Sequence, residues 1–461
     1  MLEESDVRDV LSAALTSGAD WAEIFAERRD STAIYVEDHR IEQLTSSRLQ
    51  GAGVRVVRGT QASYAYTNVL RRESLLDAAR AAAAGIQGDR PVTVADLTRA
   101  EPPVRHPALV APADVDKAAK VAIARRCEEA AWAEGSEVRQ VTVSYADVAQ
   151  RVFVANSLGR LADSTRIRTR LAAQVVAARD DLVQTGFEGP GASKGLEHFD
   201  EHPPEETGAL AAQRALRLLD SVPMPAGELT VVLSAGGGGV LFHEACGHGL
   251  EADAVGKDNS VYARTRGQRV GSELFSGVDD PTLPGGWGSY EFDDEGTPAQ
   301  RATLFEHGYQ VGVLSDRVSA HRLDEGSTGH GRRQSYAHLP QPRMANSFVL
   351  PGTDDPDAIV ADVAHGLYCV ELGGGEVRSA TGDFVFGVNE GYLIENGELT
   401  RRVRGATLIG NGPRTLALVD AVGTDFAQKQ GMCGKGGQWV PVSFGTPTLR
   451  IARLTVGGTA A

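Results

Sequence analysis

Residues 229–251 read LTVVLSAGGGGVLFHEACGHGLE. The apolar run 229–233 has the pattern of a buried strand, and the four glycines at 236–239 separate it from a segment with helical character. Further along, short apolar runs alternate with turn signals such as Pro284-Gly285-Gly286 and Asn396-Gly397. This pattern predicts that the second half of the chain is rich in β-strands and contains one clear helix, directly after the glycines.

The first half of the chain mixes helical and strand patterns. Apolar residues recur at helical spacing over 6–15, 73–84 and 114–134. Strand patterns are seen over 22–35, 138–145, 151–155 and 167–178. A chain of 461 residues is also longer than one hydrophobic core usually serves. Both observations favour two domains, the first of them mixed α and β.

The break between the two halves is marked by a glycine-rich stretch at 186–195 and by Pro203-Pro204. We therefore predict an α+β fold of two domains. The N-terminal domain is expected to be mixed α/β and to cover 1–205. The C-terminal domain is expected to be β-rich and to cover 206–461. It is also expected to carry the helix after the glycines as a zinc-binding helix, because this helix contains His243 and His248.

The charge balance excludes several classes of function. Lys and Arg number 46 against 61 Asp and Glu, and the formal net charge of -15 would repel nucleic acid and anionic membrane surfaces. No stretch approaches the roughly 18 apolar residues of a membrane-spanning helix. The acidic start Met1-Leu2-Glu3-Glu4 also differs from the basic start of a secretory signal. We therefore expect a cytoplasmic protein that binds neither nucleic acid nor membranes.

The four cysteines, at 127, 246, 369 and 433, are too few and too scattered for a disulfide framework. Cys127 lies in a helical run and Cys369 in an apolar one, so both are expected to be buried apolar residues without chemistry. A metal-binding role remains open for Cys246 and Cys433.

Two histidines flank a glutamate in the helix after the glycines. His243 and His248 are five residues apart, which on a regular α-helix separates them by roughly 140° around the axis, too far to share one metal ion. A π-turn of about 4.4 residues brings them back to roughly 50°. Gly247 and Gly249 supply the backbone freedom for such a distortion. Metal binding by this segment therefore requires a π-bulge.

Catalytic zinc takes three protein ligands and keeps one position for water, so a third ligand must come from elsewhere. Cys433 is the best candidate, because its glycine-rich loop at 430–438 can bring a thiol close to another backbone, and Lys435 nearby would favour the thiolate. Cys246 is a rival, but it lies within the same helix turn and is expected to point away. Glu244 could take the proton of the zinc-bound water and pass it to the leaving amine.

Taken alone, two histidines five apart around a glutamate are more often incidental polarity on a helix than a metal site. The glycines at 236–239 could instead hold a phosphate at a helix N-terminus, but the Gly-Lys-Ser/Thr ending of a P-loop is missing. The residues alone therefore leave both the metal site and the plain helix open.

Beyond this helix, the second half of the chain resembles the TldD branch of the TldD/PmbA metalloprotease family. The resemblance rests on short motifs whose order and identity together are far more specific than any one of them. They are HEACGHGLE at 243–251, DDEGTP at 293–298, GRRQSYAH at 331–338, PRMAN at 342–346, GGG at 373–375, TGDF at 381–384, IENG at 394–397, GATLIG at 405–410 and CGK at 433–435. The first half resembles the family only in its general layout.

The resemblance implies a zinc site formed by His243, His248 and Cys433, with Glu244 as the catalytic residue. Members of the family are typically cytosolic proteases that trim unfolded or leader-bearing peptides, often as a heterodimer with a PmbA-type subunit that lacks the metal ligands. Because this chain keeps them, it is expected to be the catalytic subunit of a dimer, with itself or with a PmbA/TldE-type paralogue. Peptides would bind as extended strands added to a sheet edge, which implies low sequence specificity.

Two other sets of polar residues are left out of the predicted site. His330, Arg332, Arg333 and His338 could line the cleft, but arginine and histidine on a loop are usually solvated or structural. Asp293-Asp294 is expected to form a turn or cap rather than a second metal site. Two alternatives to the zinc peptidase stay open, namely a non-catalytic peptide-binding regulatory partner and a zinc hydrolase of small amides.

Overall fold

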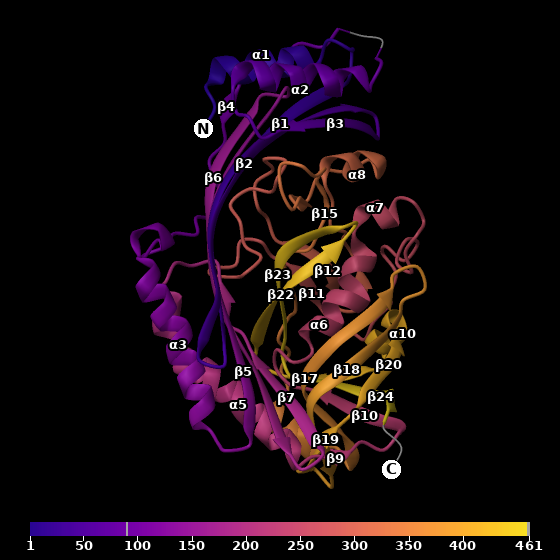
Figure 1. Ribbon diagram of the computed structural model, residues 1–461. Coiled ribbons are helices and arrows are strands. Elements are labelled where there is room, and N and C mark those ends of the chain that lie inside the picture. The colour runs from indigo at the N-terminus through magenta and orange to yellow at the C-terminus, as the bar shows by residue number, and fades with distance from the viewer. Residues whose placement is uncertain (89–90, 459–461) are drawn as a thin grey trace.

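A computed structural model describes residues 1–88 and 91–458 of the chain. The strands form an N-terminal sheet of eight strands, a second eight-stranded sheet, a six-stranded sheet and a two-stranded ribbon. The long N-terminal strands run down one side of the molecule, and the C-terminal sheets lie beside them (Figure 1). The mixed α and β composition predicted from the sequence is confirmed, whereas the division into two domains at 205/206 stays a prediction.

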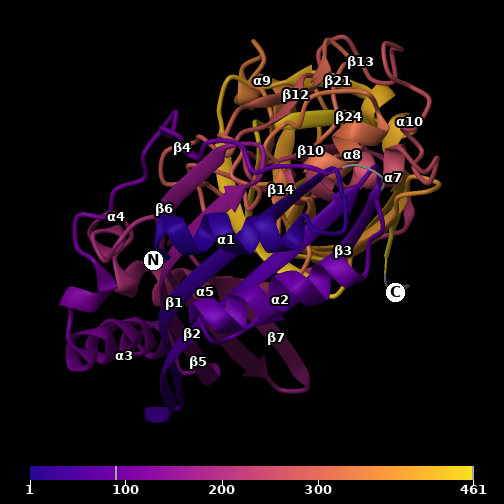
Figure 2. The same cartoon turned by 90° about the horizontal axis from the view of Figure 1, so that it is seen from above.

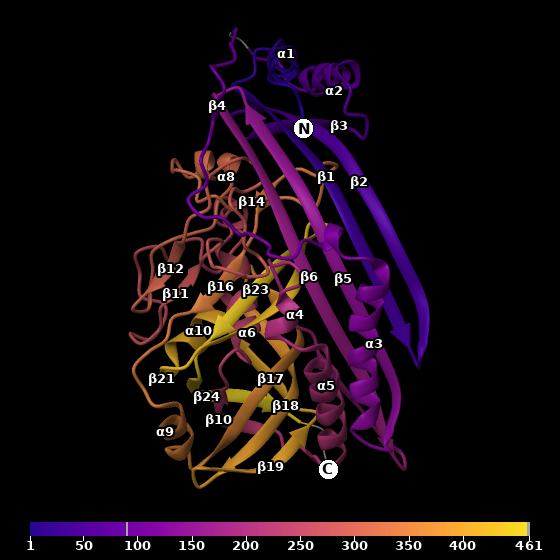
Figure 3. The same ribbon diagram turned by 90° about the vertical axis from the view of Figure 1, so that its left-hand side faces the viewer.

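The N-terminal sheet has the strand order β3-β2-β1-β5-β6-β4, and β7 and β8 also pair with β6. The strands are β1 (Trp21–Glu37), β2 (Arg40–Arg58), β3 (Gln61–Thr67), β4 (Thr98–Arg99), β5 (Val138–Asn156), β6 (Arg160–Arg179), β7 (Leu182–Glu188) and β8 (Gly191–Ala192). The strands predicted at 138–145 and 151–155 form one continuous strand, because β5 has a partner strand on each side almost throughout. These long strands are visible side by side in Figure 3.

Successive side chains of β1 point to opposite faces of this sheet. Ile24 lies in the apolar core shared with α1 (Glu4–Ala14) and α2 (Arg72–Ala84), and Ile34 lies in the core shared with α3 (Lys117–Ala133) and α5 (Pro204–Leu219). Figures 1 and 2 show these helices beside the long strands. On the other face, Glu23 and Glu27 bind residues 333 and 336 of the second half. The helices of this region are α1 (Glu4–Ala14), α2 (Arg72–Ala84), α3 (Lys117–Ala133), α4 (His198–Glu201) and α5 (Pro204–Leu219), with a 3-10 turn at Pro112–Asp114.

The second eight-stranded sheet has the order β17-β10-β24-β20-β18-β19-β9, with β21 beside β24, and an additional pairing joins β17 to β18. Its strands are β9 (Val222–Pro223), β10 (Gly227–Leu233), β17 (His365–Arg378), β18 (Asp383–Glu395), β19 (Glu398–Arg404), β20 (Thr407–Asn411), β21 (Val419–Val422) and β24 (Leu449–Gly457). The apolar run 229–233 lies in β10, between β17 and β24, as its buried-strand pattern predicted.

The six-stranded sheet has the order β13-β12-β11-β16-β23-β22, so β22 is an edge strand. Its strands are β11 (Gly277–Asp279), β12 (Ala302–Glu306), β13 (Tyr309–Gln310), β16 (Asn346–Val349), β22 (Ala427–Lys435) and β23 (Gln438–Thr446). The ribbon pairs β14 (Gly331–Arg332) with β15 (Gln341–Pro342). The short helices of the second half, apart from the one after the glycines, are α7 (Ala252–Val255), α8 (Arg317–Arg322), α9 (Pro356–Ala361) and α10 (Gly412–Ala417).

The helical segment after the glycines packs against both C-terminal sheets. It begins as α6 (Gly239–Phe242), continues as a π-turn (His243–Gly247) and ends as a 3-10 turn (His248–Leu250). Its apolar side chains share one core with residues of β10, β17 and β23. Burial of this apolar side leaves the polar side of the segment facing away from the core. Across 1–88 and 91–458, no helix is both long and apolar enough to span a membrane.

Candidate metal centre

The π-turn that the histidine spacing requires is present at His243–Gly247, so this prediction is confirmed. The reason given for Gly247 was wrong, because its backbone has ordinary helical angles, φ -55° and ψ -54°. A Cβ at Gly247 would lie 1.9 Å from the sulfur of Met344, and a Cβ at Gly239 would lie 2.7 Å from the backbone nitrogen of Gly445. These glycines are therefore needed for close approach to neighbouring chain rather than for unusual dihedral angles.

The three residues predicted as metal ligands come together beside this turn. One ligand atom from each of His243, His248 and Cys433 lies within 4.8 Å of the others. The Cys433 sulfur lies 3.3 Å from Nε2 of His248, although 185 positions separate the two residues in the chain. Cys433 reaches the helical segment from β22, the edge strand of the six-stranded sheet. The predicted grouping of these side chains is therefore present in the structure.

The chemistry of this cluster fits a zinc ion, because two imidazoles and a thiolate are typical zinc ligands. His243 is 2% exposed, and its Nδ1 has no hydrogen-bond partner among the described residues. A buried polar atom without a partner usually marks a missing one, such as an ion. Burial by itself would raise the pKa of the Cys433 thiol, but His243 and His248 lower it to about 4, and this favours the thiolate that binds metals.

Glu244 lines the same cavity as the three clustered residues, and this cavity has a volume of about 930 Å³. The Glu244 side chain is 26% exposed, and its Oε2 lies 3.8 Å from Nε2 of His248. A carboxylate beside the cluster and open to the cavity is placed to exchange a proton with a molecule that binds there.

Glu251 is a buried carboxylate that the sequence analysis missed as part of the site. It is 1% exposed, and its Oε2 lies 3.0 Å from Nδ1 of His248 and 3.0 Å from Nζ of Lys435. Burial would raise the pKa of Glu251, but the charges of His248 and Lys435 lower it to about 2. The carboxylate therefore holds the His248 ring so that Nε2 faces Cys433. The signal in the sequence was an acidic residue three positions after the second histidine.

Lys435 and Arg343 stabilise the positions of residues next to the cluster. Lys435 was expected to favour the Cys433 thiolate, but its ammonium binds Glu251 and Asp253, and the lowered pKa of the thiol comes from the two histidines instead. Arg343 is fully buried and donates a 2.5 Å hydrogen bond to the backbone carbonyl of Cys433. It therefore fixes the backbone of β22 at the residue that supplies the sulfur.

Cys246 takes no part in the cluster. It is fully buried in the core between the sheets, where the hydroxyl of Tyr262 lies 3.7 Å from its sulfur. Burial raises the pKa of Cys246 to about 12, so it remains a thiol. Cys127 and Cys369 are also buried and free, as the sequence predicted.

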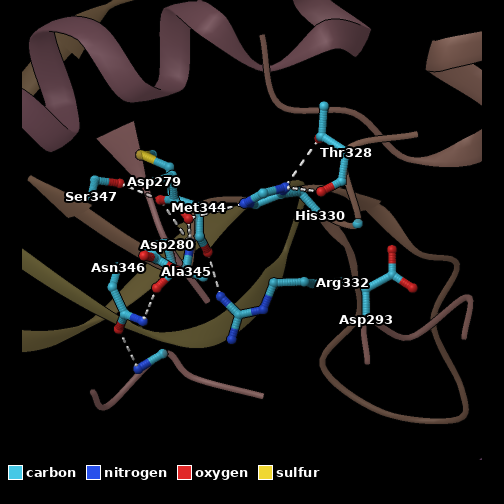
Figure 4. A network of polar contacts seen from close by, with 12 residues as sticks. Asp279, Asp280, Asp293, Thr328, His330, Arg332, Met344, Ala345, Asn346 and Ser347 are labelled. Carbon is cyan, nitrogen blue, oxygen red and sulfur yellow. Dashed lines mark hydrogen bonds and ion pairs between the residues drawn. The ribbon is translucent and has the colours of Figure 1, made fainter. Parts of the chain in front are cut away.

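The polar residues that were left out of the predicted site hold the surrounding backbone. His330 is fully buried, with Nδ1 2.8 Å from the carbonyl oxygen of Thr328 and Nε2 3.0 Å from Oδ1 of Asp279 (Figure 4). Arg332 donates to the carbonyl oxygen of Met344, the residue whose sulfur packs against Gly247. These groups stabilise the chain behind the π-turn and do not line the 930 Å³ cavity.

The other residues of this set are also structural. Arg333 forms a buried ion pair of 2.6 Å with Glu23 of β1, and His338 bonds the hydroxyl of Ser335. Asp293 accepts hydrogen bonds from the backbone nitrogens of residues 295 and 297, which confirms the predicted turn.

A groove extends from the cluster along β22. The cavity at the cluster is bordered by β22 on one side and by the end of β17 on the other. A second cavity of about 660 Å³ continues beside both strands, and Val240 and Phe444 line the two cavities together. Within the described chain β22 pairs only with β23, so its second edge has backbone groups without a partner strand.

Models of one protein family match three consecutive parts of the chain. They are described as PmbA/TldA metallopeptidase domain 1, central domain and C-terminal domain, and they match residues 22–85, 111–219 and 226–458. The chain belongs to the PmbA/TldA metallopeptidase family. The part of the chain that matches the C-terminal domain model contains all three clustered residues and Glu244.

Relatives in the same family are similar along almost their whole length. A Haemophilus influenzae protein named metalloprotease TldD homolog is 35% identical over 95% of this chain and 93% of its own. A Methanothermobacter thermautotrophicus protein named metalloprotease is 33% identical over 95% of this chain and 96% of its own. These names support a peptidase activity. The solved TldE of Thermococcus kodakarensis shares the fold, with a TM-score of 0.81 and 17% identity over 98% of this chain and 100% of that one.

Proposed function

We propose that this chain is a zinc-dependent peptidase that hydrolyses peptide bonds in unfolded or leader-bearing peptides. In this proposal His243, His248 and Cys433 hold the zinc ion, and Glu244 is the catalytic residue. The observation that carries it is the meeting of a cysteine from an edge strand with two histidines of a π-turn, beside a cavity-lining carboxylate. Zinc in such a ligand set supplies Lewis acidity toward water and the peptide carbonyl.

The side chains around the proposed metal ligands have different roles in the reaction. Glu244 takes a proton from the attacking water and gives it to the nitrogen of the leaving amine, which its position in the cavity permits. Glu251 and Lys435 keep the His248 ring in one orientation. Arg343 fixes the backbone at Cys433, so that the sulfur stays beside the two rings.

Peptide substrates bind in an extended conformation along the groove. The unpaired edge of β22 offers backbone donors and acceptors to a strand that lies beside it, and Cys433 lies on the same strand. Recognition through backbone groups depends little on side chains, so the proposed enzyme accepts many sequences. A folded protein does not present a free extended strand, which restricts cleavage to unfolded segments.

We also propose a cytoplasmic dimer. All four cysteines are free, which suits a reducing compartment. The partner is a second copy or a PmbA/TldE-type paralogue. The net charge of -15 argues against nucleic acid or an anionic membrane as a partner.

The experiment that tests this function compares wild type with Glu244→Gln, both with zinc measured per chain and with cleavage of an unfolded protein followed by mass spectrometry. We expect unchanged zinc and a roughly 10²- to 10⁴-fold slower cleavage, the usual contribution of a general base. Glu398→Gln, an exposed carboxylate outside the cavity, is the matched control and should cleave like wild type. Normal cleavage by Glu244→Gln would overturn the assigned mechanism, and peptide binding without turnover in wild type would favour the regulatory partner.

A further inference from the structure

A second group of metal-ligating side chains lies outside the centre described above. Residues 198–202 read HFDEH, in which two histidines four apart flank a glutamate, a spacing that one class of zinc peptidases uses. The side chains belong to α4 and the residue that follows it. One ligand atom from each of His198, Glu201 and His202 lies within 4.8 Å of the others.

His198 is the buried member of this group and has no partner of its own. The residue is 2% exposed, and neither ring nitrogen makes a hydrogen bond of normal geometry within the described chain, although the carbonyl of Pro190 lies nearby. The ring centroids of His198 and His202 are 4.8 Å apart. Leaving both nitrogens of a buried imidazole unsatisfied costs free energy, and a bound ion would satisfy one of the two.

Lys194 occupies the place that a cation would take beside Glu201. Its Nζ lies 2.6 Å from both carboxylate oxygens of Glu201. The Lys194 side chain is 31% exposed and that of Glu201 is 54% exposed, so the pair can separate at little cost. A divalent ion would replace the ammonium as the partner of this carboxylate.

The second group of side chains faces the groove. His198, Glu201 and His202 line the 660 Å³ cavity, which shares Val240 and Phe444 with the cavity of the first centre. The two clusters therefore lie in neighbouring parts of one groove, and an ion bound at the second would have open positions toward it.

We propose that His198, Glu201 and His202 form a second binding site for a divalent transition-metal ion of the zinc type. Two imidazoles and one carboxylate are a ligand set that zinc accepts with positions left over for water or substrate. This site is independent of the proposed function, because it shares no residue with the first centre.

The test is the number of zinc ions bound per chain, measured by equilibrium dialysis and elemental analysis on the full-length protein. We expect two for wild type, one for His202→Ala and one for Cys433→Ser, with none for the double variant. His202 and Glu201 are exposed, so His202→Ala and Glu201→Gln should fold normally. His321→Ala removes an exposed histidine from another short helix, α8, and should still bind two.

Cobalt substitution distinguishes the two sites by their absorption spectra. Cobalt bound through Cys433 has a thiolate charge-transfer band, whereas cobalt held by imidazole and carboxylate has none. We expect His202→Ala to lose one cobalt and keep the band, and Cys433→Ser to keep one cobalt and lose the band. A single ion in wild type that only Cys433→Ser removes would overturn the second site. A single ion that only His202→Ala removes would support it and overturn the proposed zinc peptidase centre instead.

Discussion

Two buried histidines in the second half of this chain have opposite surroundings. His330 is fully buried and both of its ring nitrogens have partners, on Thr328 and Asp279. His243 is almost as buried, yet its Nδ1 has no partner among the described residues and the side chain lines a cavity. Residue type and burial are the same in both places. The difference lies in whether the polar atoms are satisfied, which separates a stabilising network from a site that can accept a ligand.

The comparison predicts that the two regions respond in opposite ways to substitution. Removing a ligand from the cluster of His243, His248 and Cys433 should remove function and leave the fold, because these side chains line a cavity and Nδ1 of His243 has no partner among the described residues. Removing a partner from the network around His330 leaves buried polar groups unsatisfied and lowers the free energy of unfolding.

The largest expected effect is the loss of zinc and of cleavage in Cys433→Ser. Serine lacks the soft thiolate, so we expect zinc to fall from one to none at this centre and cleavage to fall to background. Elemental analysis and a peptide-cleavage assay on the same preparation measure both. Cys246→Ala is the matched control, since Cys246 is buried away from the cluster, and it should keep both properties. Removal of zinc by a chelator should also abolish cleavage in wild type, and added zinc should restore it.

The next effect is a loss of stability in the network of Figure 4. Asp279→Ala leaves His330, the backbone nitrogen of Ala345 and the hydroxyl of Ser347 without their acceptor. We expect the free energy of unfolding to fall by about 3–5 kcal/mol, as for other broken buried pairs. Urea denaturation measures this fall, and zinc per folded chain should be unchanged.

Asp280→Ala is the control for this prediction. Asp280 is only partly buried and caps its own turn by accepting from the nitrogen and the hydroxyl of Thr282. Its loss should cost about 1 kcal/mol. Equal losses for the two aspartates would contradict the contrast between a buried network and a turn cap.

Glu251 orients a ligand of the cluster, and Glu251→Gln should weaken zinc binding without unfolding the chain. The amide holds the His248 ring less firmly than the carboxylate, so we expect a roughly 10- to 100-fold lower affinity, as for other groups behind metal-bound histidines. Competition with a zinc-binding dye measures the affinity. Asp253→Asn removes the other carboxylate that binds Lys435 and should change it by no more than about twofold. Unchanged affinity in Glu251→Gln would show that the ring is oriented without it.

A pH dependence of stability is expected from a buried carboxyl group outside the cluster. Burial raises the pKa of Glu295 to about 8, although Arg55 opposes the rise, and Asp316, Asp293 and Glu23 add to it. A carboxyl group whose pKa is raised on folding stabilises the protein fully below its unfolded pKa, and this contribution is lost as the pH rises through about 8. We therefore expect wild type to lose stability between about pH 4.5 and about pH 8, and Glu295→Gln to lose less. Parallel urea midpoints for the two proteins over this range would contradict the assignment.

Much of the site followed from the sequence because its constraints are local or chemical. The spacing of His243 and His248 required a π-turn, and the need for a third soft ligand pointed to Cys433. The residues that hold the predicted metal ligands in place could not be predicted from the sequence, because Glu251, Arg343 and Lys435 meet only when distant segments pack together. The roles of Gly247 and Lys435 were misjudged for the same reason, since the sulfur of Met344 and the carboxylate of Glu251 cannot be placed from local sequence.

The same limit applied to the fold. Apolar periodicity predicted α1, α2 and α3 to within a few residues, because the spacing of apolar residues reports which side of a helix is buried. β5 was predicted as two strands, 138–145 and 151–155, because its continuity depends on partner strands on both sides, and pairing between distant strands leaves no mark in one segment.

The separation of 185 positions between His248 and Cys433 has a consequence for the time at which the protein becomes active. A ribosome translates both histidines and Glu244 long before it reaches the cysteine. Under the proposed ligand set, the nascent chain cannot complete its metal centre until β22 has been made and has paired with β23. The order of synthesis therefore keeps this peptidase inactive while its own unfolded segments are still exposed.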